Sequence, residues 1–207
     1  MSHAQPLVPA FEIAFQLMFK PQSPQSLDDL LARAEHFANF AMRTRGKVPP
    51  ALLAISPDGP LFFVPSALAD ERAKDNFANT ARLICVAHAA TAAVMILEAW
   101  MKLAAPDGSL DLSVPPSESL NRREVVLLTG ETRAGFKQKI LPIIRTGAGG
   151  FFGFGEFDGP SATSFEGRFA QILPPKRPSP EMQTKARTLL AAMGVTPAAL
   201  RRDWSAN

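Results

Sequence analysis

Two segments of the chain place apolar residues three or four positions apart, which is the spacing of one face of a helix. The first begins near Leu27, after a capping box formed by Ser26 and Asp29, and Gly46 can end it in a left-handed conformation. The second runs from about residue 68 to residue 89. We therefore predict two amphipathic core helices.

The other apolar runs have the pattern of strands. Two short runs around the Pro-Asp-Gly of residues 57–59 predict a β-hairpin. Residues 92–102 are apolar on both alternating sides, which predicts a central strand covered on both faces. Pro142 interrupts a later strand, which we expect to lie at an edge or to carry a bulge. Further strands are expected in residues 123–131, 138–146 and 165–173, and residues 147–159 are expected to form a turn and a strand.

The order of these elements is helix, two strands, helix, several strands and a helical tail, which is typical of an α+β fold. We predict a mainly antiparallel sheet of about five to seven strands with two core helices, compatible with profilin-like or roadblock-like sandwiches. At about 150 residues per domain, the 207-residue chain indicates one core with extensions. The predicted units are an N-terminal extension (1–25), an α+β core (26–173) and a basic helical tail (174–207).

The positive charge of the chain is concentrated in this tail. The whole sequence holds 22 basic and 19 acidic residues, with a pI near 9.3. Six of the cations lie in the tail against Glu181 and Asp203, so the rest of the chain is close to neutral. Two short helices there would suit phosphate contacts, whereas the alternative is a tail that docks on the core. The tail residues that form this candidate site for an anionic partner are Lys176, Arg177, Lys185, Arg187, Arg201 and Arg202.

Several kinds of site are excluded by composition and spacing. The single cysteine, Cys85, rules out an intramolecular disulfide and a multi-cysteine zinc site, and the three histidines lack the spacing of a local metal site. The glycines of residues 147–155 match neither nucleotide-binding signature, so no cofactor is predicted. No apolar run approaches about 20 residues, and the N-terminus lacks the pattern of a signal peptide. We expect a cytoplasmic protein without a membrane segment.

The most suggestive polar residues flank two neighbouring predicted strands. Glu98 interrupts an apolar strand, and an unpaired buried carboxylate is costly. If the two strands pair antiparallel, Glu98 lies near Arg122 or Arg123, and its loss would destabilise the fold by ~2–4 kcal/mol if the arginine is left buried. The cluster would hold an anion beneath the preceding loop, or it would be a structural salt bridge beside a capped turn. This candidate polar site consists of Glu98, Ser117, Glu118, Arg122, Arg123 and Glu124.

The same region carries a resemblance to known proteins. The combination of Glu98-Ala-Trp100, a loop with Pro116-Ser117 and the run Arg122-Arg123-Glu124-Val125 resembles small uncharacterised α+β proteins of bacterial and phage genomes. The resemblance covers roughly the central half of the chain. It implies a microbial, cytoplasmic protein with the domain limits given above, and it carries over no activity and no catalytic residue.

Three functions are compatible with these features. We expect first a non-enzymatic interaction or accessory module, with a protein partner or self-association, because no catalytic signature is present. The second hypothesis is a small-ligand-binding protein or enzyme that uses the polar cluster around Glu98. The third is nucleic-acid association through the basic tail, which predicts salt-sensitive binding that disappears when residues 174–207 are removed.

Overall fold

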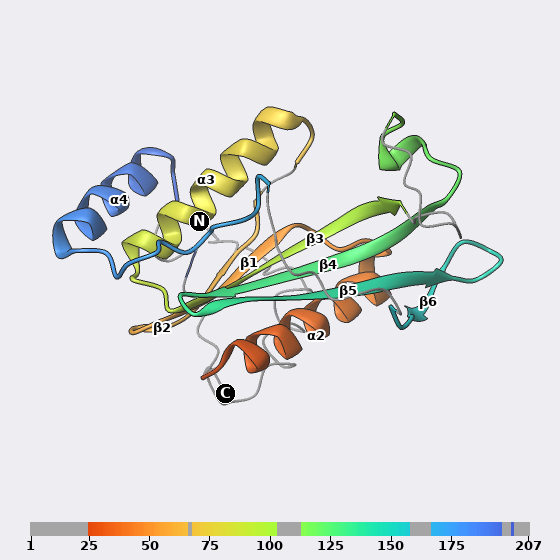
Figure 1. The fold of residues 1–207 in the computed structure, drawn as a ribbon, viewed down its shortest axis with the longest axis horizontal. Helices are drawn as coiled ribbons and strands as arrows, with labels where there is room; N and C mark the ends of the chain where they lie inside the picture. Colours follow the sequence, from red (N-terminus) through yellow and green to blue (C-terminus); the bar gives the residue numbers. More distant parts are fainter. Residues whose placement is uncertain (1–24, 66–67, 103–112, 158–166, 196–199, 201–207) are drawn as a thin grey trace, which may run out of the picture.

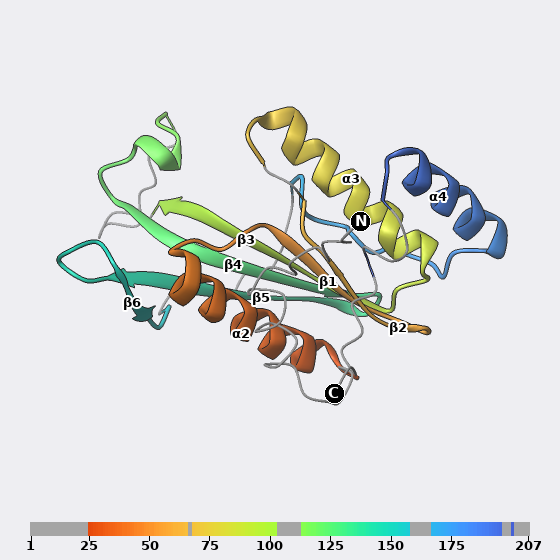
Figure 2. The same cartoon turned by 180° about the vertical axis from the view of Figure 1, so that it is seen from behind.

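Six antiparallel strands form one curled sheet in the order β2-β1-β3-β4-β5-β6 (Figure 1). The computed structural model describes residues 25–65, 68–102, 113–157, 167–195 and 200. Helix α2 lies on one side of the sheet, and α3 and α4 lie on the other (Figure 1, Figure 2). The predicted α+β class, with a mainly antiparallel sheet, two core helices and a C-terminal helix, is confirmed. The elements are α2 (Leu27–Arg45), β1 (Ala51–Ser56), β2 (Gly59–Phe63), α3 (Glu71–Ala87), β3 (Ala92–Lys102), the short 3-10 helix η1 (Pro116–Glu118), β4 (Arg122–Thr132), β5 (Gly135–Arg145), β6 (Phe151–Phe154) and α4 (Pro180–Ala192).

Helix α2 begins and ends where the sequence predicts. The Ser26 hydroxyl accepts a hydrogen bond from the Asp29 amide, and the Asp29 carboxylate accepts one from the Ser26 amide, both at 3.1 Å. Gly46 ends the helix with a φ of 69°, a left-handed conformation that glycine adopts without strain. The buried face of α2 packs on one face of the sheet, whose buried residues there include Leu53, Val94, Ile96, Val126 and Leu128.

Helix α3 covers part of the opposite face, with α4 beside it. The Asp70 carboxylate caps α3 by accepting a hydrogen bond from the Ala73 amide at 2.7 Å, so the helix begins at Glu71 instead of residue 68. A second core forms between the helices and the sheet. Its buried residues include Leu52 and Met95 from the strands, Phe77, Ala81 and Ile84 from α3, and Ala186 and Leu190 from α4.

The predicted closing strand is wrong over residues 167–173, and its first two residues lie outside the described part of the chain. Side chains take the place of a neighbouring strand in this segment. The Arg82 guanidinium donates to backbone carbonyls that include Arg168 at 2.6 Å, and the buried Glu131 carboxylate accepts from the Ile172 amide at 2.8 Å. Because these backbone groups are satisfied by side chains, the segment does not need a strand ladder.

Strand β5 continues through Pro142 and lies between β4 and β6 instead of at the sheet edge. Pro142 keeps its register opposite Val125, and its carbonyl accepts a hydrogen bond from the Gly155 amide at 2.8 Å. The pairing with β6 shifts register between Ile144 and Arg145, two residues after the proline. The predicted irregularity is therefore present, but β6 forms the edge.

Strands β3, β4 and β5 extend beyond both α3 and β1 (Figure 1). Each has 11 residues, about 36 Å at roughly 3.3 Å per residue, whereas the 17 residues of α3 span about 26 Å. The pairing of β1 with β3 is confined to Ala92–Ile96 of β3. The prediction that residues 92–102 are covered on both faces therefore holds for the first half of β3 and is wrong for the second, where burial is incomplete.

Candidate functional site

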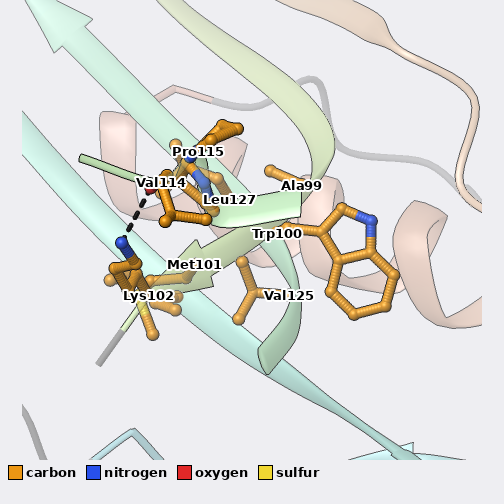
Figure 3. A pocket seen from close by; sticks show the side chains of 10 residues that line it. Ala99, Trp100, Met101, Lys102, Val114, Pro115, Val125 and Leu127 are labelled. Carbon is orange, nitrogen blue, oxygen red and sulfur yellow. Dashed lines mark hydrogen bonds between the residues drawn. The ribbon is translucent and has the colours of Figure 1, made fainter. Parts of the chain in front are cut away.

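An apolar groove of about 390 Å³ lies on the α3 side of the sheet, at the open end of β3, β4 and β5 (Figure 3). The strands supply its floor, and the loop before η1 supplies a wall. Among the described residues of the lining, Lys102 is the one that carries a charge. The floor and wall consist of Ala99, Trp100, Met101 and Lys102 from β3, Val125 and Leu127 from β4, Ile140 from β5, and Val114, Pro115 and Pro116 from the loop and η1.

The hollow follows from the alternation of side chains along β3. On the α3 side, the short side chain of Ala99 stands between the longer ones of Leu97 and Met101. The wall is held in place from β3, because the Lys102 ammonium donates a hydrogen bond to the Val114 carbonyl at 2.7 Å. The groove is thus shaped by the strand sequence and fixed by a tether across it.

Cations and an exposed aromatic ring lie at the same end of the sheet as the groove. The Trp100 side chain is 43% exposed, and the Arg122 guanidinium lies over its ring, 4.4 Å from the centroid. Arg122 and Arg123 are exposed, and neither forms an ion pair with any residue that the structure describes. Among the described residues at this edge, Lys102, Arg122 and Arg123 are basic, and Glu118 of η1 is acidic.

On the α2 side of the same sheet end, the carboxylates are engaged in structural contacts. The Glu124 carboxylate accepts two hydrogen bonds from the Arg145 guanidinium, one of them from Nε at 2.6 Å. This hydrogen bonding raises the pKa of Arg145, and the negative charge of Glu98 adds to the effect. Glu98 itself accepts a hydrogen bond from the Val48 amide at 2.7 Å. These carboxylates hold the chain together and face away from the groove.

The six residues of the predicted polar site are therefore divided between the two sides of the sheet. The antiparallel pairing is as expected, but its register places Glu98 opposite Val126, whereas Arg122 lies opposite Lys102. Glu98, Arg122 and Glu124 share the α2 side by strand alternation. The other three (Arg123, Ser117 and Glu118) belong to the groove side or to η1, and none of the six lines the groove.

Sequence reasoning missed Arg145 and the groove. Arg145, the arginine that neighbours Glu98 and Glu124, comes from β5, a strand that the sequence did not connect with them. The apolar floor residues were taken as ordinary core. The lengths of two elements do indicate the groove. The 11 residues of β3 extend farther than the 17 residues of α3, so the helix leaves the end of the strand uncovered.

The described part of the tail is bound to the core. Helix α4 buries Ala186 and Leu190 against α3. The Arg187 guanidinium donates to the Ala87 carbonyl at 3.1 Å, and Lys185 forms an ion pair with Glu181 at 2.7 Å. Of the remaining predicted tail cations, Lys176 and Arg177 are exposed, and Arg201 and Arg202 lie outside the described residues.

The buried thiol has no catalytic environment. Cys85 is fully buried in the core between α3 and the sheet, and burial raises its pKa, which disfavours the nucleophilic thiolate. Among the residues that the structure describes, no group of three or more histidine, cysteine or carboxylate side chains is placed to hold a metal ion. No described helix is both long and apolar enough to cross a membrane.

The chain matches no family model, no curated protein and no solved structure. The resemblance to bacterial and phage proteins and the analogy with profilin-like or roadblock-like sandwiches therefore stay predictions. Function is inferred from the geometry of the sheet end alone.

Proposed function

We propose that the protein is a non-enzymatic accessory module that binds an acidic segment of a partner protein at the open end of its sheet. The observation that carries the proposal is the apolar groove at that end, which no described helix covers. A cytoplasmic location and a microbial origin stay part of the proposal as predictions from the sequence.

Apolar exposure at this end of the molecule supports a protein partner. Elements at the same end of the sheet carry large side chains that are partly or fully open to solvent: Trp100 (43%), Leu120 (101%), Ile144 (44%) and Phe152 (70%). Large exposed apolar side chains beside charged residues are typical of interaction sites, and tryptophan and arginine are the residues that most often dominate binding energy there. Trp100 with the stacked Arg122 is therefore the expected centre of the interface.

The charges at this edge support an acidic partner. Arg122 and Arg123 are exposed and form no ion pair with a described residue, and the Lys102 ammonium lies at the same edge. Complementary charge across an interface speeds association and selects the partner. The aliphatic floor favours side chains of a polypeptide over phosphates of a nucleic acid, whose contacts would be with cations.

The volume of the groove also favours a second candidate, a small apolar ligand. Small-molecule sites occupy roughly 300–1,000 Å³, and the groove falls within that range. We prefer a polypeptide because Arg122 and Arg123 lie at the same sheet end but outside the groove lining, and a ligand confined to the groove would leave them uncovered.

A titration with short capped peptides tests the proposal. In the probe set, glutamate alternates with valine, leucine or phenylalanine, and the readout is Trp100 fluorescence in a Trp204→Phe background. We expect a saturable change that the corresponding lysine-containing peptides do not give. Ala99→Leu fills the hollow and should weaken binding roughly tenfold or more, whereas Ala191→Leu on the exposed surface of α4 should leave it unchanged.

A pair of charge reversals locates the binding charge. Arg123→Glu should weaken binding of the acidic peptides, and the matched Arg177→Glu in the tail should not. The opposite result would assign the anion-binding site to the tail. Absence of saturable binding by every acidic peptide of the set would overturn the proposed function.

A further inference from the structure

We propose that the partner segment binds as an added β-strand along the edge of β3 formed by Leu97–Met101, in line with β1. This inference rests on the proposed function and states how that site holds its partner. It adds backbone pairing to the side-chain contacts described above, and it fixes which residues of the partner face the groove.

The first support is the unpaired edge. Strand β1 pairs with β3 as far as Ile96, and beyond that point β3 pairs with β4 alone among the described residues. Alternate residues of an antiparallel strand direct their N–H and C=O groups to each side, so Leu97–Met101 present such groups along the open edge. An edge of this kind is a template for another strand.

The chain that leads into β1 cannot close this edge itself. Pro49 and Pro50 come directly before β1, and proline has no N–H to donate to a ladder. The contact that holds this part of the chain to β3 comes from a side chain, since the Val48 amide donates to the Glu98 carboxylate at 2.7 Å. The prolines therefore end the β1 ladder at Ile96, and beyond it the described chain adds no backbone pairing to this edge of β3.

The second support is that the two sides of this edge differ in chemistry. Side chains of an added strand would alternate between the groove beside Ala99 and the opposite side, where Arg122 stacks on Trp100. Apolar residues suit the groove. On the opposite side an acidic residue suits the Arg122 guanidinium, and the Glu98 carboxylate on that side already accepts a hydrogen bond from the Val48 amide. The geometry thus specifies a partner strand in which apolar and acidic residues alternate.

The two outer edges of the sheet fit such a strand less well. Strand β2 has five residues and includes Pro60, and β6 has four residues and includes Gly153. Neither residue favours a stable strand pair. The β3 edge differs from both because the groove lies beside it.

Backbone methylation of the probe peptide tests strand addition without changing the protein. Two versions of the best-binding acidic peptide are made, one N-methylated at the glutamates and one at the apolar residues. Because only alternate amides of an added strand pair with its neighbour, one version should lose roughly tenfold or more in affinity and the other should bind as the parent does. Hydrogen exchange of amides in Leu97–Met101 should slow when the parent peptide is bound.

The outcomes separate this inference from the proposed function. If the parent peptide binds and Ala99→Leu weakens it, but both methylated versions bind equally and β3 exchange is unchanged, strand addition is wrong and the docking surface stands. If the parent peptide does not bind, both proposals fail.

Discussion

Glu131 is predicted to anchor the C-terminal segment to the sheet. Its side chain is 8% exposed, and its carboxylate accepts hydrogen bonds from the Ile172 amide at 2.8 Å and from the Leu173 amide at 3.3 Å. Glu131→Ala leaves both amides without this acceptor. At about 1–3 kcal/mol for each buried unsatisfied group, with the longer bond at the low end, the expected loss is about 2–4 kcal/mol of unfolding free energy.

Thermal unfolding followed by circular dichroism measures this loss. For a chain of this size, about 2–4 °C per kcal/mol gives a Tm lower by roughly 5–15 °C. Glu156→Ala is the matched control, because Glu156 is exposed and its replacement should change stability by less than about 0.5 kcal/mol. Amide exchange at Ile172 should also accelerate in Glu131→Ala. Equal Tm values for the two variants would refute the anchoring role.

Three smaller predictions follow from contacts at the surface. Glu98→Ala should cost about 0.5–1.5 kcal/mol in urea unfolding, below the ~2–4 kcal/mol expected for a buried arginine pair, because Glu98 is exposed and accepts one backbone hydrogen bond. Ser26→Ala should cost about 1 kcal/mol through loss of the α2 cap, and a cost near zero would contradict the cap. Hydrogen bonds from Lys74 and Arg168 lower the pKa of Glu71. The ionised Glu71 side chain therefore stabilises the folded state fully above its ordinary pKa of 4.5, and this contribution is lost as the pH falls through the lowered pKa. Thermal unfolding across this acid range should show that the Tm difference between the unchanged protein and Glu71→Gln shrinks as the pH falls. A constant Tm difference would contradict the ion pairs.

Local signals in the sequence predicted most of the elements. The Ser26 and Asp29 pair, the left-handed Gly46 and the periodicity between them define α2 without any tertiary information. The turn of residues 57–59 defines the β1–β2 hairpin in the same way. The residues that form these contacts lie within a few positions of one another, so the local sequence is sufficient to predict both elements.

Contacts between distant residues decide what the sequence did not predict. Residues 167–173 look like a strand by their alternation, but Arg82 and Glu131, distant in the chain, satisfy their backbone groups instead. Arg145 reaches Glu124 from β5. The sequence identified the residues around Glu98 as the region of interest, but only the register of β3 and β4 shows that they lie on two sides of the sheet.

The groove escaped prediction for a related reason. Ala99, Val125 and Leu127 are apolar like core residues, and they line a groove only because α3 ends before the end of β3. The tail illustrates the converse case, since the predicted alternative of docking holds for the described helix α4, which buries Leu190 against α3. In both cases the position of a helix on the sheet decides which surface is open.

The most direct test of the docking surface is a map of backbone amide chemical shifts in the isotope-labelled full chain as the acidic peptide is added. The account predicts that the largest changes fall in Leu97–Met101 of β3 and Val125–Leu127 of β4. Changes confined to residues 174–195 would contradict it and would move the binding site to the tail.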